Sequence, residues 1–204
     1  MRVLEQARQE NVITDDVSLL ISYLKILDSR ESDTAQHSLL VNRIAMELGR
    51  QLELPPNELL QLNWGTLLHD IGKLGISDAI LLKQAKLTDE EYEIIQRHPL
   101  AGYEMLKGNS YLTSASLVVR YHHEKWDGNG YPDRLQGKQI PLLARICGVA
   151  DTVAAMAADR PYRKAASLAS IIAELRAHAG SQFDPEIVDA FLAMPKKHDV
   201  IILN

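Results

Sequence analysis

Histidine is the residue type that most clearly points to chemistry in this chain of 204 residues. Five of its seven histidines lie beside other residues able to bind a metal or a phosphate: His37, His69, His98, His122 and His123. Imidazole and carboxylate ligands favour iron, manganese, nickel or zinc, whereas softer metals are held by thiolates. The single cysteine, Cys147, excludes an internal disulfide framework and a cysteine-rich zinc module.

Four candidate ligands lie at helical spacing from a series of apolar or small residues, so that each shares a helix face with that series. They are His37, His69, His122 and Asp151. His69, for example, follows Leu62 and Thr66 at spacings of seven and three residues, which place all three on one helix face. A single inward histidine is more often a hydrogen-bonded core residue. Burying four polar groups unpaired is costly, however, and a metal would satisfy several at once.

The sharpest local motif is His69-Asp70-Ile71-Gly72-Lys73. Its first two residues supply one nitrogen and one carboxylate, and a carboxylate can bridge two metals. Lys73 lies on the same side as His69 if the helix continues, and there it could contact a phosphate as a point charge. The alternative is a surface lysine at a helix C-terminus, with Gly72 merely ending the helix.

A second motif, His122-His123-Glu124, is followed by a loop rich in glycine over residues 127–132. Paired histidines at a helix end can reach one metal if the backbone turns there. The loop could present backbone N–H groups to a phosphate, or it could be an ordinary turn. Farther on, Arg160 and Arg163 could clamp phosphates or be solvated.

The elements that must position these residues are predicted to be helices joined by short loops. Apolar periodicity and capping signals predict them over about 32–49, after Pro55-Pro56 to about 69, from 88, and over about 110–122, 142–158, 167–179 and from 184. With 46% apolar and 24% charged residues the chain is of ordinary globular composition. A net charge of −5 argues against duplex nucleic acid as a partner, and no apolar run is long enough to span a bilayer.

In combination, the ordered motifs resemble the HD-GYP branch of the HD superfamily of metal-dependent phosphohydrolases. They are His69-Asp70-Ile71-Gly72-Lys73, His98-Pro99, His122-His123-Glu124, Gly130-Tyr131-Pro132 and Arg160-Pro161-Tyr162-Arg163. The resemblance covers residues 30–194 and implies an all-α, single helical-bundle domain with a buried metal centre and a Gly-Tyr-Pro loop. We expect the catalytic domain over 31–195, a helical connector from a regulatory domain over 1–30, and a tail over 196–204.

The resemblance also implies a ligand set. One metal would be held by His37, His69, Asp70 and Asp151, and Asp70 would bridge to a second metal held by His98, His122 and His123. Asp33 stands where trinuclear members carry glutamate and is a candidate ligand for a third ion, but its shorter side chain favours two. Iron or manganese is the first expectation for the ions, with nickel or zinc as alternatives.

The activity implied is hydrolysis of cyclic di-GMP to pGpG, and onward to GMP, by two-metal activation of a bridging water. Asp70 and Lys73 would be catalytic, and the substrate contacts would be Lys73, Gly130, Tyr131, Arg160 and Arg163. The Gly-Tyr-Pro loop is also expected to contact diguanylate cyclases, and the protein to be cytoplasmic. The alternatives are a phosphodiesterase for another cyclic dinucleotide, such as cyclic GMP-AMP, or a cyclic di-GMP sensor with little turnover.

Two positions depart from the family pattern. Ala154 stands where the family usually has aspartate, and Ala157 where it often has threonine or serine. Loss of polar groups around a metal site can lower metal affinity or activity by about 10–100-fold. The rate and the metal preference are therefore the properties we expect these alanines to affect.

Overall fold

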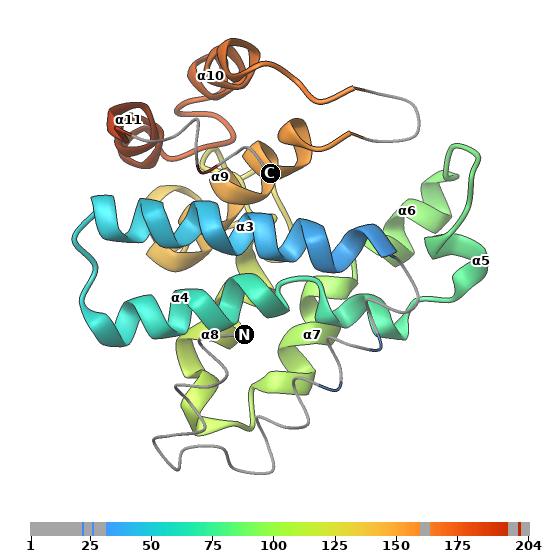
Figure 1. Ribbon diagram of the computed structural model, residues 1–204. Coiled ribbons are helices and arrows are strands. Elements are labelled where there is room, and N and C mark those ends of the chain that lie inside the picture. The colour runs from blue at the N-terminus through green and yellow to red at the C-terminus, as the bar shows by residue number, and fades with distance from the viewer. Residues whose placement is uncertain (1–21, 23–25, 27–31, 160–163, 196–199, 201–204) are drawn as a thin grey trace.

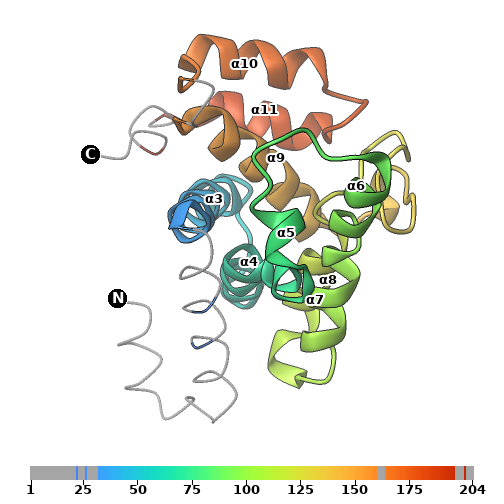
Figure 2. The same ribbon diagram turned by 90° about the vertical axis from the view of Figure 1, so that its right-hand side faces the viewer.

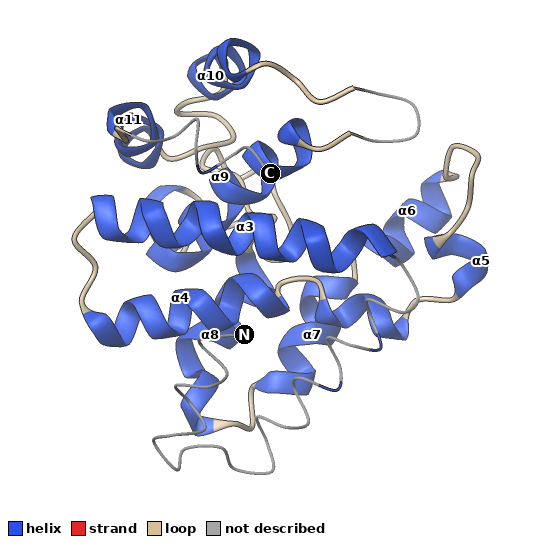
Figure 3. Ribbon diagram, in the orientation of Figure 1, coloured by secondary structure: helices blue, strands red, loops and turns tan. Residues whose placement is uncertain are grey.

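The computed structural model describes residues 32–159 and 164–195, together with residues 22, 26 and 200. Within this part every regular element is a helix, and only two isolated bridges pair extended residues (Figure 3). The predicted all-α fold is therefore confirmed. The proposed connector over 1–30, apart from residues 22 and 26, lies outside the described residues, as do Arg160, Arg163, the tail apart from residue 200, and the side chain of Asp33.

The first two helices of the described part form an antiparallel pair. Helix α3 (Ser32–Gln51) lies beside α4 (Pro56–Leu68), and a short turn joins them at one end (Figure 1). Glu53 in that turn has a φ of 55°, and Pro56 opens α4 at a position where its missing N–H costs no hydrogen bond. This pair brings the ends that carry His37 and His69 to the same side of the molecule.

Short elements follow and lead into the second half of the bundle. They are η1 (Ile71–Gly75), α5 (Asp78–Leu81), α6 (Asp89–Ile95), α7 (His98–Leu106), η2 (Ser110–Leu112), α8 (Thr113–Tyr121), η3 (Gly137–Gln139), α9 (Leu142–Ala157), α10 (Leu168–Ala177) and α11 (Pro185–Ala193). The sequence signals at two helix starts are confirmed, because Thr88 forms a capping box with Glu91 and Asp184 caps α11 ahead of Pro185. Among the described residues, no helix is both long and apolar enough to cross a membrane.

Two apolar clusters hold these helices together. The larger one joins α3 and α9 with α10 and α11, and Figure 2 shows α10 and α11 covering α9. The smaller one joins α4, η1, α7, η2 and α8, with Trp64, Leu68 and Ile71 among its members. Ala154 is fully buried in the larger cluster, so at this position the chain has an apolar core contact.

A close backbone approach fixes η1 against α7. A Cβ added to Gly72 would lie 1.9 Å from the carbonyl oxygen of His98 and 2.6 Å from the amide nitrogen of Gly102. Gly72 is therefore required for packing, and the reading of it as a simple helix end is wrong. Helix α4 already ends at Leu68, and Gly72 lies inside the 3₁₀ turn that follows. This contact sets the start of α7 directly beside Asp70.

Candidate metal centre and adjoining pocket

The first pair of candidate ligands comes from α3 and α9, which pack against each other. His37 Nε2 lies 2.9 Å from Asp151 Oδ1, and both side chains are partly buried. The apolar residues Val41, Ile44 and Leu48 on the same face of α3 are completely buried and direct this face inward. A metal ion bound between this nitrogen and this oxygen would take the place of the shared proton.

The His69-Asp70 pair stands where α4 gives way to η1. Both side chains are almost completely buried, and His69 Nε2 lies 3.4 Å from Asp70 Oδ2. Lys73 Nζ lies 2.7 Å from the same oxygen. Helix α4 ends at Leu68, close to the predicted end at about residue 69, so the condition for Lys73 to share a helix face with His69 is not met. The 3₁₀ turn instead places Lys73 on Asp70 at a spacing of three residues.

Backbone carbonyls orient three of the histidines in the same manner. In each case Nδ1 lies within 2.9 Å of the carbonyl oxygen three residues earlier, at Thr66 for His69, Ile95 for His98 and Val119 for His122. A carbonyl can only accept, so Nδ1 carries the proton and Nε2 presents its lone pair to the centre. This is the arrangement by which proteins orient histidine ligands of metals.

The second group of candidate ligands is built from imidazoles alone. His98, His122 and His123 offer ligand atoms that all lie within 4.8 Å of one another. His98 Nε2 lies 3.3 Å from His122 Nε2 and 3.3 Å from Asp70 Oδ1. Three electron-rich acceptor atoms therefore converge on one point, and a cation placed there would satisfy all of them. The donor set fits a transition-metal ion.

The first group is mixed, because His37, His69 and Asp70 also offer ligand atoms within 4.8 Å of one another. Asp70 faces both groups: its Oδ2 is near His69, and its Oδ1 is near His98. The structure thus brings together six of the seven residues predicted as metal ligands in two groups that meet at one carboxylate, and Asp151 joins them through His37. Either group could hold a metal ion.

The protonation states also suit metal binding, since metals bind ionised carboxylates and neutral imidazoles. Burial opposes ionisation of Asp70, but Lys73 and the surrounding imidazoles outweigh it and hold the pKa well below its usual range. Burial lowers the pKa of His122 well below its usual range and that of His123 to about 4. At neutral pH both imidazoles are uncharged and can act as ligands.

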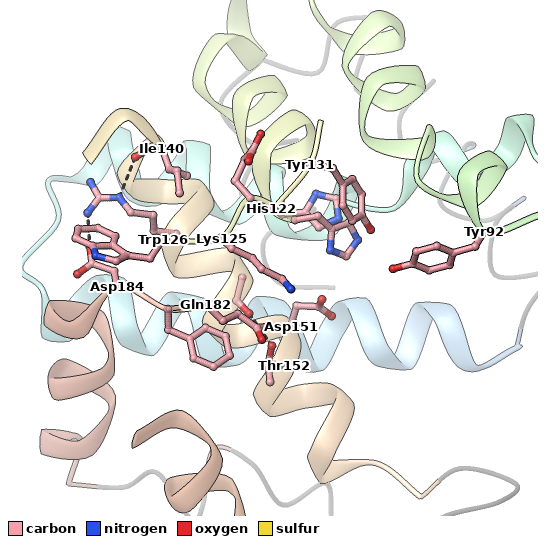
Figure 4. A pocket seen from close by; sticks show the side chains of 15 residues that line it. Tyr92, His122, Lys125, Trp126, Tyr131, Ile140, Asp151, Thr152, Gln182 and Asp184 are labelled. Atoms are coloured by element: carbon pink, nitrogen blue, oxygen red, sulfur yellow. Dashed lines mark hydrogen bonds and ion pairs between the residues drawn. The ribbon is translucent and has the colours of Figure 1, made fainter. Parts of the chain in front are cut away.

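A pocket of about 200 Å³ opens beside the imidazole group (Figure 4). His122, His123 and Asp151 form one wall, and Tyr131 of the Gly-Tyr-Pro loop lies over His123 with ring centroids 4.8 Å apart. Gly130 does not line this pocket: a Cβ there would lie 2.3 Å from the amide nitrogen of Lys125, so it permits a close backbone approach. Of the described residues predicted to contact substrate, Tyr131 is the one that lines the pocket.

The loop that carries Tyr131 is fixed by Glu124, a residue for which the sequence suggested no role. Its buried carboxylate accepts hydrogen bonds from the amide nitrogens of Asp133 at 2.7 Å and Leu135 at 3.1 Å. Arg120 forms an ion pair with Asp133 at 2.9 Å and closes the loop from outside. Glu124 thus links the metal-ligand candidate His123 to the shape of the loop.

Other pocket residues were missed by sequence reasoning altogether. They include Tyr92 from α6, Lys125, Thr152 from α9 and Gln182. Only Lys125 carried a usable signal, since it follows the His122-His123-Glu124 motif directly. The others approach from separate parts of the chain, and their proximity depends on packing that no local pattern reports.

Comparison with known proteins places this geometry in a family. A sequence model described as HD domain matches residues 16–187. The chain belongs to the HD domain family. It is 39% identical over 170 residues to the cyclic di-GMP phosphodiesterase response regulator RpfG of Xanthomonas campestris, covering 82% of this chain and 45% of the relative. It is 40% identical over 174 residues to the cyclic di-GMP phosphodiesterase PA4108 of Pseudomonas aeruginosa, covering 85% of this chain and 42% of the relative.

The resemblance to HD-GYP proteins stated from the motifs is confirmed by these relatives, although the chain spans less than half the length of either. Among solved structures, a cyclic GMP-AMP-specific phosphodiesterase of Vibrio cholerae superposes with a TM-score of 0.68 at 22% identity. The match covers 91% of this HD domain chain and 50% of that one. At this identity the likeness shows a shared fold.

Proposed function

We propose that this HD domain chain is a metal-dependent phosphodiesterase that hydrolyses cyclic di-GMP to pGpG and onward to GMP. The observation that carries the proposal is the placement of the Asp70 carboxylate between two groups of ligand atoms, with histidine Nε2 lone pairs directed at the space between them. The names of the relatives RpfG and PA4108 indicate the substrate class. The pocket beside the groups offers the room for that substrate to approach.

Two divalent ions, with iron or manganese expected first, would be held by the mixed group with Asp151 and by the imidazole group. Bound there, they would lower the pKa of a coordinated water and neutralise charge on the phosphate. The remaining chemistry belongs to the chain itself. Asp70 holds the two groups in register, and Lys73, paired with Asp70, can hold its proton near the leaving oxygen.

Tyr131 contributes to positioning. Its ring is tilted against His123 at an interplanar angle of 32° and forms one side of the pocket, where it can contact a base or ribose of the substrate. Burial raises its pKa above the usual range, so its hydroxyl remains protonated at neutral pH and is available as a hydrogen-bond donor. Contact of the same loop with a diguanylate cyclase stays a prediction of the resemblance.

A second candidate substrate is cyclic GMP-AMP. The chain is 35% identical over 179 residues to a relative named 3'3'-cGAMP-specific phosphodiesterase 2 of Vibrio cholerae, covering 85% of this chain and 34% of the relative. Both substrates share the cyclic phosphodiester backbone and differ in one base. The two ligand groups are therefore suited to the phosphodiester of either substrate, and discrimination between the two bases depends on the pocket.

The test is turnover of each cyclic dinucleotide by protein prepared without oxygen and loaded separately with iron and manganese, with products separated by chromatography. We expect pGpG or GMP from cyclic di-GMP, and no product from the Asp70→Ala variant. Hydrolysis of cyclic GMP-AMP alone would reassign the substrate. Tight binding of intact cyclic di-GMP by metal-loaded protein without any product would contradict the enzyme and favour a sensor.

A further inference from the structure

The charged side chains that line the pocket are not equally available to a ligand. Arg145 forms an ion pair with Asp184, and its Nε donates to the carbonyl of Ile140 at 2.9 Å. Glu124 is committed to the backbone of the loop. These groups therefore stabilise the pocket wall and leave little capacity for a substrate.

Lys125 differs from these groups. It follows the imidazole group by two residues, lines the pocket, and extends across it with its ammonium directed toward Asp151 (Figure 4). Among the described residues, its ammonium has no ion-pair or hydrogen-bond partner within the usual distances. A lysine stem lying along the wall with its charged head in the cavity is suited to an anionic ligand.

The other described lysine expected to meet phosphate occupies a different place. Lys73 Nζ is held on Asp70 Oδ2 at 2.7 Å, and Lys73 is not among the residues that line the pocket in the described part of the chain. Divalent ions held by Asp70 and Asp151 would offset the negative charge of these carboxylates, which would leave the Lys125 ammonium available for an anion in the cavity.

We propose that Lys125 is a substrate-binding residue that forms a charge-assisted hydrogen bond to a phosphate of the cyclic dinucleotide. This inference rests on the proposed function and adds a contact to it. A cyclic dinucleotide carries two phosphodiester groups, and the one under attack lies at the metal centre. Lys125, on the pocket wall beyond the ligand groups, binds the phosphate that is not being cleaved and so orients the ring for attack on the other.

A contact of this kind acts mainly on binding. Hydrogen bonds to charged groups contribute enough that their loss weakens binding by about tenfold or more. Lys125→Met keeps the apolar stem and removes the charge, so we expect KM to rise about tenfold or more while kcat changes much less. Lys125→Arg keeps the charge and should retain most of the affinity.

The experiment measures equilibrium binding as well as turnover, using the manganese-loaded full chain. The binding probe is a phosphorothioate analogue of cyclic di-GMP that resists hydrolysis, and calorimetry gives its Kd. Lys138→Met is the matched control, because Lys138 is a surface lysine of the same region that pairs with Glu186 at 3.1 Å and does not line the pocket. Circular dichroism melting establishes that each variant folds.

Weaker binding of the analogue by Lys125→Met, with recovery in Lys125→Arg and no change in Lys138→Met, supports the inference. An unchanged Kd in Lys125→Met overturns it, whether or not the unaltered chain hydrolyses cyclic di-GMP. If the unaltered chain binds the analogue without any turnover, the phosphodiesterase is contradicted while the Lys125 contact still stands or falls on its own Kd. Absence of both binding and turnover overturns both proposals.

Discussion

The two groups of candidate ligands differ in how the charges and lone pairs of their buried atoms are balanced. In the mixed group, the hydrogen bond between His37 and Asp151 and the ion pair between Lys73 and Asp70 already balance charge within the protein. In the imidazole group, backbone carbonyls fix the protons of His98 and His122 on Nδ1, and their Nε2 atoms face each other at 3.3 Å. The imidazole group therefore depends more strongly on a cation.

This difference predicts different metal preferences at the two positions. Carboxylate ligands favour harder ions such as manganese, whereas imidazole ligands favour iron, nickel and zinc. The groups are nevertheless joined, because one oxygen of Asp70 faces each of them. If a variant loses only one ion, the two groups are separate sites. If it loses both ions together, they form one cooperative centre.

The largest loss of activity is expected from substitution of Asp70, because its carboxylate faces both ligand groups. Asp70→Ala removes the shared carboxylate, and we expect activity to fall well beyond the about 10–100-fold typical of outer residues. Metal content should fall in both groups, as measured by elemental analysis after loading and desalting. Full activity in this variant would refute the account.

The comparison itself is tested by removing one histidine from each group. His98→Ala should lose the ion of the imidazole group, and His37→Ala the ion of the mixed group, so that each variant keeps about one of two ions. Loss of the ion is expected because each variant removes one imidazole nitrogen from the set of ligand atoms that would hold that ion. Metal titration followed by elemental analysis checks the stoichiometry, and loss of both ions in both variants would break the distinction.

A smaller and structural effect is expected where η1 meets α7. Gly72→Ala introduces a methyl group 1.9 Å from the carbonyl oxygen of His98, so the start of α7 must move. Overpacking of this kind costs about 1–3 kcal/mol of unfolding free energy, and movement of His98 should weaken metal binding. Denaturant unfolding and metal titration measure the two effects.

Gly75→Ala is the matched control on the same 3₁₀ turn. A Cβ added there has no heavy atom within 4 Å outside its immediate chain neighbours, and Gly75 is not among the glycines with positive φ. We expect its stability to be unchanged or slightly raised, since alanine restricts the unfolded chain. Equal losses in the two variants would show that the contact with His98 is not the cause.

The helices, their caps and most of the inward-facing ligands could be predicted from the sequence. Apolar stripes at helical spacing predicted that His37, His69 and His122 point inward, and the structure places them in the two groups. The capping box at Thr88 and the cap at Asp184 are likewise readable locally, because each depends on residues within one turn. Regular helices and their caps are properties of short segments.

The remainder depends on contacts between distant segments. The close approach of Gly72 to α7 and the role of Glu124 in holding residues 133–135 follow from tertiary packing. The end of the helix near His69 is predicted correctly, but the 3₁₀ turn that follows it and places Lys73 on Asp70 is not, because the residues from His69 to Lys73 give no signal that identifies such a turn. Pocket residues such as Lys125 can be identified only once the cavity is formed.

The central claim is that two metal ions lie on either side of Asp70. Anomalous X-ray diffraction from crystals of the iron- or manganese-loaded chain tests it most directly. The account predicts two peaks, one among His37, His69 and Asp151 and one among His98, His122 and His123, with the Asp70 carboxylate between them. A single peak, or no peak within these groups, would contradict it.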